Sequence, residues 1–372
     1  MRIAYLSTFF PFRGGIAQFN ASLFRELEKN HEIKAFNFSR QYPNLLFPGT
    51  TQFVSPDDHA DQIPSEQILD SINPLSYFKT AIEIRKFNPD LLIIGTWMPF
   101  FSPAFGMISS ILKSEMKIIG IYHNVVPHEK RVIDSFLLKM YLNQNHGIVV
   151  MNHISKKQII DLGFKKNILL KPHPVYNHFG NSISKSESRK ILNLHPDKKT
   201  LLFFGFIRDY KGLDLLIESS KYLSDDFQIV IAGEVYGNFE KYAKQIELLN
   251  TGGKFHQFIR YIDDSEVPLF FSAADVCVLP YKSATQSGIV QIAYNFDLPV
   301  IATNVGGLSE MVLDNETGLI INEQSSKLLA EKIGFYFSNH LEDKFREGIR
   351  SRKSFFSWNG FAEEIIKLYK NL

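Results

Sequence analysis

Two cationic side chains stand three residues apart in the segment GFIRDYKG, residues 205–212. Arg208 and Lys211 follow an apolar run that ends at Gly205, and an apolar helical pattern begins directly after them. Such a pair in front of a helix N-terminus suits a diphosphate, because the side chains and the helix dipole both favour negative charge. A charged turn exposed to solvent is the alternative. The segment predicts a site for a diphosphate group.

Hydroxyl groups and glycines also precede helical patterns at two later places. The segment YKSATQSGI, residues 281–289, is rich in hydroxyl and amide groups, and TNVGGLSE, residues 303–310, contains a glycine pair. Side chains of these types offer hydrogen bonds near a helix N-terminus, where a phosphate is favoured. Three turns of this kind in one half of the chain predict a crevice for phosphate and ribose.

The first half of the chain has two polar clusters, and each follows an apolar run. FPFRGGI, residues 10–16, places Gly14 and Gly15 before a helical pattern, so that the backbone can approach a ligand closely. YHNVVPHE, residues 122–129, holds two histidines and an asparagine, which could bind hydroxyl groups or move protons. The alternatives are a plain strand-to-helix turn and a structural histidine.

Several motifs of known catalytic and metal sites are absent from the sequence. It contains no Asp-x-Asp pair, no H-E-x-x-H, no C-x-x-C, no G-x-S-x-G, no G-x-G-x-x-G and no G-K-[ST]. These absences disfavour zinc and serine-hydrolase chemistry, and we predict no metal site. The single cysteine, Cys277, excludes an internal disulfide and lies in an apolar run typical of a buried strand.

Short apolar runs alternate with helical patterns along the whole chain, which predicts parallel, doubly wound α/β sheets. Runs without strict alternation indicate strands that are buried on both faces. In the first half we expect strands at residues 3–6, 32–38, 91–95, 117–123, 147–151 and 168–171, and helices at 17–29, 77–87, 104–112, 133–142 and 155–162. In the second half we expect strands at 201–204, 228–232, 258–262, 276–279, 300–303 and 319–321, and helices at 213–222, 239–249, 266–272, 289–296 and 326–337.

Two polar stretches interrupt this alternation. Residues 177–198 predict a linker with a lead-in helix, and the proline-rich residues 40–74 predict an inserted surface loop. The sequence ends in a pattern with one apolar helical face. We therefore predict two domains, one of residues 1–180 together with the closing helix 356–372, and one of residues 190–355.

The charge is divided unequally between the two halves. The 372 residues carry a net charge of +2, too small to suggest nucleic-acid binding. Residues 1–178 have 19 Lys and Arg against 14 Asp and Glu, a net charge of +5, and the rest of the chain has a net charge of −3. With 45% hydrophobic and 22% charged residues, the composition excludes a disordered chain. The asymmetry predicts different roles for the two halves.

Residues 91–112 contain no charged side chain, and a stretch of this length could span a bilayer. Pro99 and Pro103 favour a buried strand, a loop and an amphipathic helix instead. The sequence shows no long apolar signal segment, which predicts a cytoplasmic protein. Apolar and basic side chains of this region could touch an anionic bilayer, the alternative being that the aromatic ones belong to the core: Phe100, Phe101, Phe105, Met107, Lys113 and Lys117.

Four of these segments together resemble the retaining GT-B glycosyltransferases of family 4. Residues 201–219 resemble the phosphate-binding opening of that family's second domain, and residues 274–321 resemble its donor-binding region. Residues 6–27 resemble its N-terminal glycine loop, and residues 118–129 its first-domain histidine loop. The resemblance implies two Rossmann-like, doubly wound parallel-sheet domains that face each other across a cleft, with a closing helix that crosses back onto the first domain.

The resemblance also implies a reaction. A sugar would move with retention from a nucleotide-sugar donor on the second domain to a glycan or lipid-linked acceptor on the first, without a metal or other cofactor. The product would be a cell-surface polysaccharide or another glycoconjugate, made in the cytoplasm with peripheral contact to the inner face of the membrane. A non-catalytic scaffold or regulatory partner of another transferase is one alternative. A sugar-nucleotide epimerase or phosphorylase is another, since a fold does not fix a function.

The positions that match the family's motifs receive roles by this resemblance. The departing diphosphate would be stabilised by cationic side chains, and a histidine would orient a hydroxyl group beside the reacting sugar. The catalytic residues implied are His123, Arg208 and Lys211; the donor-binding residues are Gly14, Gly15, Gly205, Thr285, Gln286, Ser287, Gly288, Ile289 and Glu310; the acceptor-binding residues are Arg13, Asn124 and His128.

The sequence departs from the family pattern at three positions. Phe206 stands where the family commonly has an arginine, and Arg208 is the candidate replacement. Thr285 and Ala293 stand where the family has two glutamates, one toward the sugar and one toward the ribose. Neutral side chains at 285 and 286 could still bind hydroxyl groups, and Gln291 is the candidate ligand for the ribose.

Overall fold

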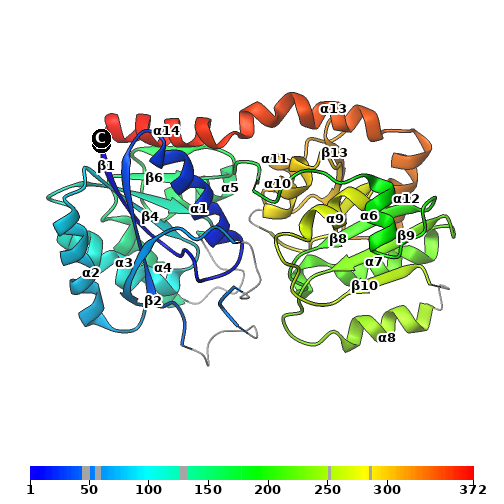
Figure 1. Cartoon of the computed structure of the whole chain (residues 1–372), viewed down its shortest axis with the longest axis horizontal. Coiled ribbons are helices and arrows are strands. Elements are labelled where there is room, and N and C mark those ends of the chain that lie inside the picture. The colour runs from blue at the N-terminus through cyan, green and yellow to red at the C-terminus, as the bar shows by residue number, and fades with distance from the viewer. Residues whose placement is uncertain (44–50, 55–59, 126–131, 177, 250–252, 285–286) are drawn as a thin grey trace. The chain divides into compact units, whose positions relative to one another are not determined.

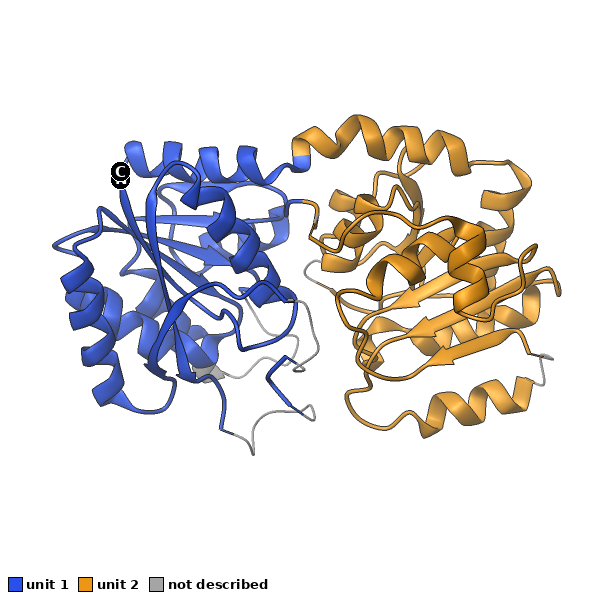
Figure 2. Cartoon of the chain, viewed as in Figure 1, with its two compact units in different colours: residues 1–174, 356–372 blue, residues 175–355 orange. Residues whose placement is uncertain are grey.

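The computed structural model describes residues 1–372 except 44–50, 55–59, 126–131, 177, 250–252 and 285–286 (Figure 1). The chain divides into two compact units, unit 1 with residues 1–174 and 356–372 and unit 2 with residues 175–355 (Figure 2). Unit 2 thus begins before the expected linker. Its first residues pack within it, because the Tyr176 ring lies 3.2 Å from the position that a Cβ atom would take at Gly288.

Parallel strands form the sheet of unit 1. In the described residues their order is β3-β2-β1-β4-β5-β6-β7. The order reverses beside β1, and in such sheets a ligand crevice opens at the carboxyl ends of the strands. The strands are β1 (Arg2–Leu6), β2 (Glu32–Arg40), β3 (Ser65–Asp70), β4 (Leu91–Thr96), β5 (Lys117–Tyr122), β6 (Gly147–Val150) and β7 (Ile168–Leu170).

Helices cover the sheet of unit 1, with α3 between α2 and α4, and with α1 packed against the closing helix α14 (Figure 1). Ser357 caps α14 by accepting a hydrogen bond from the Gly360 N–H at 3.1 Å, and Phe361 and Ile365 of that helix are fully buried. The helices are α1 (Gly15–Glu28), α2 (Pro74–Phe87), α3 (Ser102–Leu112) after the 3-10 helix η2 (Pro99–Phe101), α4 (Val132–Leu142), α5 (His153–Asp161) and α14 (Trp358–Lys370).

Unit 2 is a second parallel sheet, with the order β10-β9-β8-β11-β12-β13 in the described residues. Its strands are β8 (Lys199–Phe204), β9 (Phe227–Ala232), β10 (Phe255–Phe258), β11 (Val276–Leu279), β12 (Val300–Thr303) and β13 (Gly318–Ile321). Its helices are α6 (Lys185–Ile191), α7 (Leu213–Ser219), α8 (Glu240–Leu249), α9 (Val267–Ala273), α10 (Gly288–Asn295), α11 (Leu308–Met311), α12 (Ser326–Ser338) and α13 (Glu342–Arg352), with 3-10 turns η3 (Asp209–Lys211), η4 (Ser220–Tyr222) and η5 (Lys353–Phe356). The predicted pair of doubly wound parallel sheets is confirmed, and Cys277 is buried in β11.

The sequence predictions fail at the sheet edges and at polar helices. Residues 40–74 are not only a loop, because β3 adds an edge strand in which Leu69 is the one buried residue. The strand expected at 258–262 is β10, which lies at Phe255–Phe258 and is only partly buried. Helix α13 was not expected, since its sequence is charged and buries Phe345 and Ile349 alone. These elements contain no apolar run, so the sequence carries little of the hydrophobic periodicity that predicts a strand or a helix.

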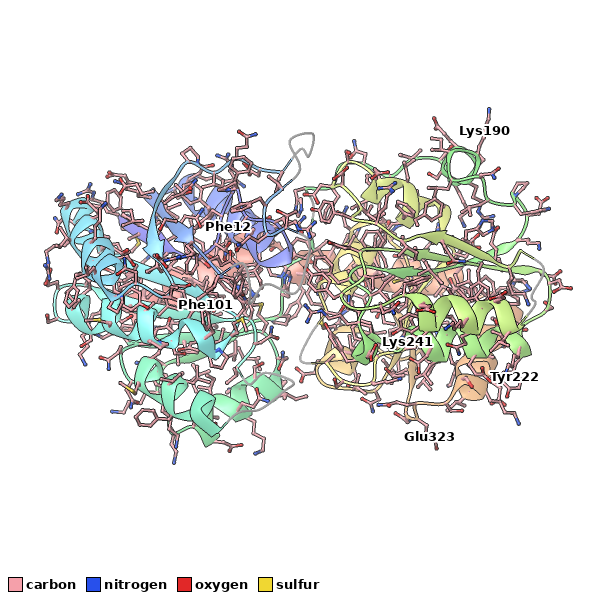
Figure 3. The ribbon with its side chains drawn as sticks, turned by 90° about the horizontal axis from the view of Figure 1, so that it is seen from below. Phe12, Phe101, Lys190, Tyr222, Lys241 and Glu323 are labelled. Carbon is pink, nitrogen blue, oxygen red and sulfur yellow. The ribbon has the colours of Figure 1, made fainter. Side chains whose placement is uncertain are left out.

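Residues 91–112 form β4, η2 and α3, as the prolines favour. Across the described ranges, no helix has both the length and the apolar character needed to cross a membrane. The bilayer-contact prediction is wrong for Phe101 and Phe105, which are fully buried. Their rings pack on Phe38 of β2 at centroid distances of 5.2 and 6.1 Å, and Figure 3 shows Phe101 inside unit 1. These rings therefore belong to the hydrophobic core of unit 1.

A buried ion pair anchors α6 to the sheet of unit 2. The Arg189 guanidinium donates to Asp275 at 2.8 Å and to the Ala273 carbonyl at 3.0 Å, and Asp275 also accepts the Thr200 N–H at 2.7 Å. Both charged residues are buried. Without Arg189, the buried Asp275 carboxylate would depend on the partly exposed Lys185, whose Nζ atom lies 2.7 Å away, and weakening a buried pair in this way is more costly than losing an exposed pair.

We expect Arg189→Met to lower the free energy of unfolding of unit 2 by about 3 kcal/mol. The matched control is Arg350→Met, which breaks an exposed pair with Asp297 and should cost less than about 1 kcal/mol. Urea unfolding followed by circular dichroism measures both. Equal losses in the two variants would contradict the structural role of the buried pair.

Candidate active site

The turn after β8 lies directly against the end of β11. Gly212 adopts a φ of +67°, and a Cβ atom at this position would lie 1.9 Å from the Pro280 carbonyl oxygen. A side chain is therefore excluded by both the left-handed backbone and the close approach. The Lys282 N–H also donates to the Tyr210 carbonyl at 2.6 Å. These contacts join two of the turns that the sequence singled out.

Gly205, Lys211 and Ile289 meet at this junction. A Cβ atom at Gly205 would lie 3.2 Å from the Lys211 Nζ atom and 3.0 Å from the Ile289 Cδ1 atom. The φ of Gly205 is +95°, so glycine is favoured here for two reasons. Three residues predicted from two separate motifs thus come together at the carboxyl ends of neighbouring strands.

Lys211 is a buried cation. It is 8% exposed, and its Nζ atom lies 5.6 Å from the centroid of the Tyr281 ring. Burial, followed by the positive charge of Arg208, lowers the pKa of Lys211 to about 7. An anion beside the ammonium group would reverse this effect, because an opposite charge favours the charged form. The site is therefore suited to a negatively charged ligand.

Arg208 and Phe206 share one aromatic neighbour. The Arg208 guanidinium lies over the Tyr236 ring at 4.5 Å, and the Phe206 ring packs against Tyr236 at 4.7 Å. A guanidinium over an aromatic face is held by a cation–π interaction. Sequence reasoning missed Tyr236, because a tyrosine in a loop after β9 belongs to no motif.

The second turn contributes Ser287, which is buried beside Tyr281. The two side-chain oxygen atoms lie 3.2 Å apart in a hydrogen bond, and α10 begins at the next residue, Gly288. The Thr303 hydroxyl, at the end of β12, donates to the Tyr281 carbonyl at 2.5 Å. The carboxyl ends of β8, β11 and β12 are thus connected by direct contacts.

Several predicted donor residues are not brought to this junction by any described contact. Thr285 and Gln286 lie outside the described residues. Gln291 and Ala293 are fully buried in α10, so Gln291 meets a ribose only if its neighbours move. Glu310 is an exposed residue of the four-residue helix α11.

The glycine loop of unit 1 is held by two buried asparagines that no motif indicated. The Asn37 amide donates to the carbonyls of Phe9 and Phe10 at 3.1 and 2.9 Å. The Asn20 amide of α1 donates to the Ser7 hydroxyl and the Thr8 carbonyl, both at 2.8 Å. Gly14 has a φ of +104° before α1 begins, in agreement with the expected glycine turn.

His123 follows β5 and is 1% exposed. Its backbone N–H donates to the Thr96 carbonyl at 2.9 Å, which fixes the loop beside the end of β4. Burial, together with the nearby His173, lowers the pKa of His123 to about 3, so the imidazole is neutral at physiological pH. A neutral imidazole donates or accepts a hydrogen bond without acting as a cation.

The remaining acceptor candidates are only partly placed. Arg13 is partly buried in the glycine loop, where its backbone N–H donates to the Gln52 carbonyl at 3.1 Å. Asn124 follows His123 and is also partly buried. His128 lies outside the described residues.

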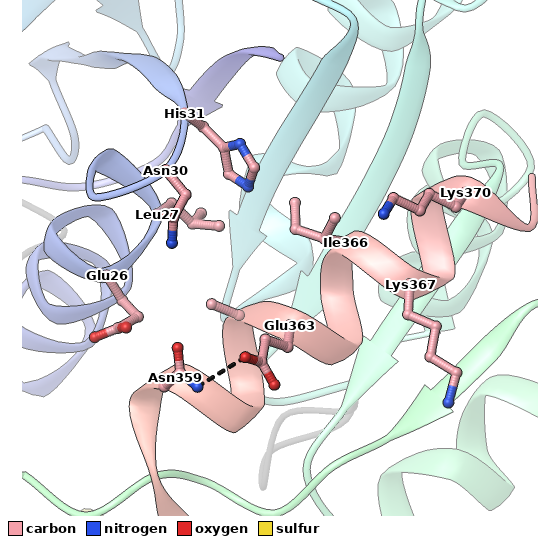
Figure 4. A pocket seen from close by; sticks show the side chains of 10 residues that line it. Glu26, Leu27, Asn30, His31, Asn359, Glu363, Ile366, Lys367 and Lys370 are labelled. Atoms are coloured by element: carbon pink, nitrogen blue, oxygen red, sulfur yellow. Dashed lines mark hydrogen bonds between the residues drawn. The ribbon is translucent and has the colours of Figure 1, made fainter.

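A hollow of about 360 Å³ lies between α1 and α14 (Figure 4). Leu27, Ala362 and Ile366 line it together with charged side chains such as Glu363, which accepts a hydrogen bond from Asn359 at 2.8 Å. Of the predicted site residues that the structure describes, none lines this hollow. It is distinct from the strand ends that carry the predicted site.

Comparisons with known proteins agree with this architecture. Residues 184–352 match the family model "Glycosyl transferases group 1". The structure of Anabaena Alr3699/HepE in complex with UDP aligns with a TM-score of 0.79 over 100% of both chains, at 16% identity. This likeness assigns the GT-B type of fold to both units.

Two curated relatives extend the match. "Uncharacterized glycosyltransferase MJ1178" of Methanocaldococcus jannaschii is 22% identical over 100% of this chain and 99% of its own length. "Spore coat protein SA" of Bacillus subtilis is 28% identical over 53% of this chain, and the alignment spans 55% of that protein. Residues 184–352 are therefore similar to a glycosyl transferases group 1 domain, and the chain, with its two Rossmann-like units, has the GT-B type of fold.

Proposed function

We propose that this protein is a retaining glycosyltransferase that moves a sugar from a nucleotide-sugar donor to a glycan or lipid-linked acceptor in the cytoplasm. The observation that carries the proposal is the junction of Gly205, Lys211 and Ile289 in the domain that matches the transferase family. The structural neighbour HepE was solved with UDP and with UDP-glucose, which supports a sugar nucleotide as the donor. The spore-coat relative is named for a surface layer, which supports a role at the cell surface.

Lys211 and Arg208 provide the chemistry for the leaving group. Cleavage of the bond between the sugar and the diphosphate places negative charge on the phosphate oxygen, and a cation fixed beside it stabilises the transition state. Burial makes this electrostatic effect stronger than it would be in water. We propose that no bound metal is needed, which agrees with the absence of an Asp-x-Asp pair from the sequence.

His123 orients a hydroxyl group rather than removing a proton. Its pKa near 3 makes it a poor proton acceptor at neutral pH, but a buried neutral imidazole is an effective hydrogen-bond partner. In this proposal the departing diphosphate oxygen accepts the proton of the acceptor hydroxyl. The sugar then keeps its anomeric configuration, because the acceptor enters on the face that the diphosphate leaves.

Half-buried aromatic side chains near the ends of β2 and β4 suit a sugar-containing acceptor. The Trp97 indole N–H donates to the Tyr42 hydroxyl at 2.8 Å, and Phe100 stacks on Tyr42 with an interplanar angle of 25°. Phe53, 45% exposed, packs on Phe12 next to the glycine loop. Aromatic rings with a polar edge are typical of sites that bind partly apolar ligands.

The exposed apolar face of unit 1 lies on α2 and α4, not on the residues predicted from the sequence. Leu75, Phe78 and Ile82 form an exposed stripe on α2, and Phe136 and Met140 are exposed on α4. Lys79 lies on α2 and Lys139 on α4. An apolar stripe with neighbouring lysines suits the surface of an anionic bilayer. We propose that this face contacts the membrane that carries a lipid-linked acceptor.

Binding of UDP should be coupled to uptake of a proton by Lys211. At about pH 8 a lysine with a pKa near 7 is mostly neutral, and a bound diphosphate restores its charge, so affinity should fall as the pH rises through 7. Titration calorimetry in buffers of different ionisation enthalpy measures the proton count. Lys211→Met should remove the uptake and weaken binding roughly tenfold to hundredfold.

The matched control is Lys241→Met, because Lys241 is an exposed lysine of unit 2 that pairs with Asp209. This variant should keep both the affinity and the proton uptake. A wild-type protein that binds none of UDP, GDP or ADP would overturn the proposed donor class. Tight nucleotide binding with no transfer or donor hydrolysis would favour a non-catalytic scaffold, which the missing glutamate pair makes the leading alternative.

His123→Asn should lower the transfer rate by about 100-fold or more, because the lost imidazole no longer orients the reacting hydroxyl. The affinity for UDP should stay unchanged, since unit 2 holds the nucleotide. Transfer is measured with the sugar nucleotide that gives the largest thermal stabilisation, with and without a chelator. His153→Asn, an exposed histidine at the start of α5, is the control and should transfer at the wild-type rate.

Leu75→Ser combined with Phe78→Ser should reduce binding to anionic vesicles at least tenfold, because about 2 kcal/mol of apolar burial is lost with each large side chain. Flotation with phosphatidylglycerol vesicles measures this. Phe335→Ser, an equally exposed phenylalanine of unit 2, should leave binding unchanged. No flotation of the wild-type protein at low salt would refute the membrane contact.

A further inference from the structure

Phe19 of α1 is the centre of a buried cluster of rings. It is fully buried, and its ring packs edge-to-face on His123 at a centroid distance of 4.5 Å. The rings of His173, Trp358 and Phe361 surround it at 5.0, 5.1 and 5.6 Å. All of these residues belong to unit 1. The cluster therefore connects segments that are far apart in the sequence.

Two members of the cluster stand where the chain crosses between the units. His173 immediately precedes Pro174, the last residue of unit 1 before the chain enters unit 2. Trp358 starts α14, two residues after the chain returns at Phe356. Imidazole Nδ1–H of His173 donates to the Pro174 carbonyl at 2.6 Å, which fixes the ring against the outgoing segment. Phe19 thus touches both crossing segments and His123.

The position of Phe19 is also fixed by the hydrogen bonds of its neighbour in α1, Asn20. The side-chain amide of the adjacent Asn20 donates to Ser7 and Thr8, and its Oδ1 atom accepts a hydrogen bond from the Tyr5 hydroxyl at 2.5 Å. These buried bonds tie the first turns of α1 to the loop that follows β1. A rigid base of this kind holds a ring in one rotamer, and edge-to-face contacts then favour one orientation of the neighbouring ring.

We propose that Phe19 is a positioning residue, which fixes the imidazole of His123 and ties its orientation to the two segments where the chain passes between the units. The inference rests on the proposed role of His123 in transfer. Misplacing a group that orients a substrate by about 1 Å can cost about 100-fold in rate. A movement of either crossing segment would thereby change the rate without a direct contact to the substrate.

The test compares Phe19→Leu with Phe361→Leu. Both changes remove a fully buried ring of the same cluster, but only Phe19 has a described ring contact with His123. We expect Phe19→Leu to lower kcat at least tenfold with the KM for the donor unchanged. Phe361→Leu should stay within about twofold of the wild type in kcat. If Phe19→Leu does not fold, Phe19→Met keeps the volume without the ring and should show the same kinetic split.

A spectroscopic readout separates this inference from the proposed function. The imidazole ¹⁵N signals of His123 should be single and narrow in the wild type and in Phe361→Leu, and shifted or doubled in Phe19→Leu. If His123→Asn leaves transfer intact while these signals still respond to Phe19→Leu, the positioning stands and the catalytic role of His123 falls. Identical His123 signals and identical kinetics in the two phenylalanine variants would overturn the inference.

Discussion

The close approach of Gly212 to the Pro280 carbonyl is the constraint on which the candidate donor site depends. A backbone that passes this near to the end of β11 requires glycine, and it places the preceding Lys211 side chain inside the unit. The ammonium group then lies next to Gly205 of the same motif, and Ile289 of a second motif also approaches Gly205. Lys211 is only 8% exposed, and a charged ammonium group that is buried away from water is destabilising unless an anion pairs with it. An anionic ligand beside Lys211 would relieve this unfavourable burial.

The free-energy cost of burying the Lys211 ammonium group explains why this lysine stands at the end of the sheet. A buried lysine in the middle of a strand would have no ligand to compensate it, whereas at the carboxyl ends of β8 and β11 the helix N-terminus of α10 adds favourable potential for an anion. The side-chain hydroxyl groups of Tyr281 and Ser287 form a hydrogen bond of 3.2 Å at the same strand ends. The two buried hydroxyl groups thus satisfy one another within the unit.

The central strands and the site motifs could be predicted from the sequence, because a strand buried on both faces is an uninterrupted apolar run. Strands β11 and β12 lie where they were expected, and β3 and β10 do not, since edge strands are only partly buried. Lys211 and Gly205 were recognisable from their spacing. Tyr236, Asn20 and Phe19 were not, because their roles arise from contacts across the fold that no local pattern records.

Net charge proved a poor guide to the ligand of each unit. The second half of the chain carries −3, yet it holds the junction suited to an anion. Carboxylates such as Asp209 and Asp297 lie in exposed pairs with Lys241 and Arg350, where water and salt screen their field. Lys211 is buried, so its field is screened far less and acts at short range. The sign of the electrostatic potential at a binding site is therefore set by the few charged groups that the fold removes from water. The net charge of the surface mainly governs how fast a ligand approaches.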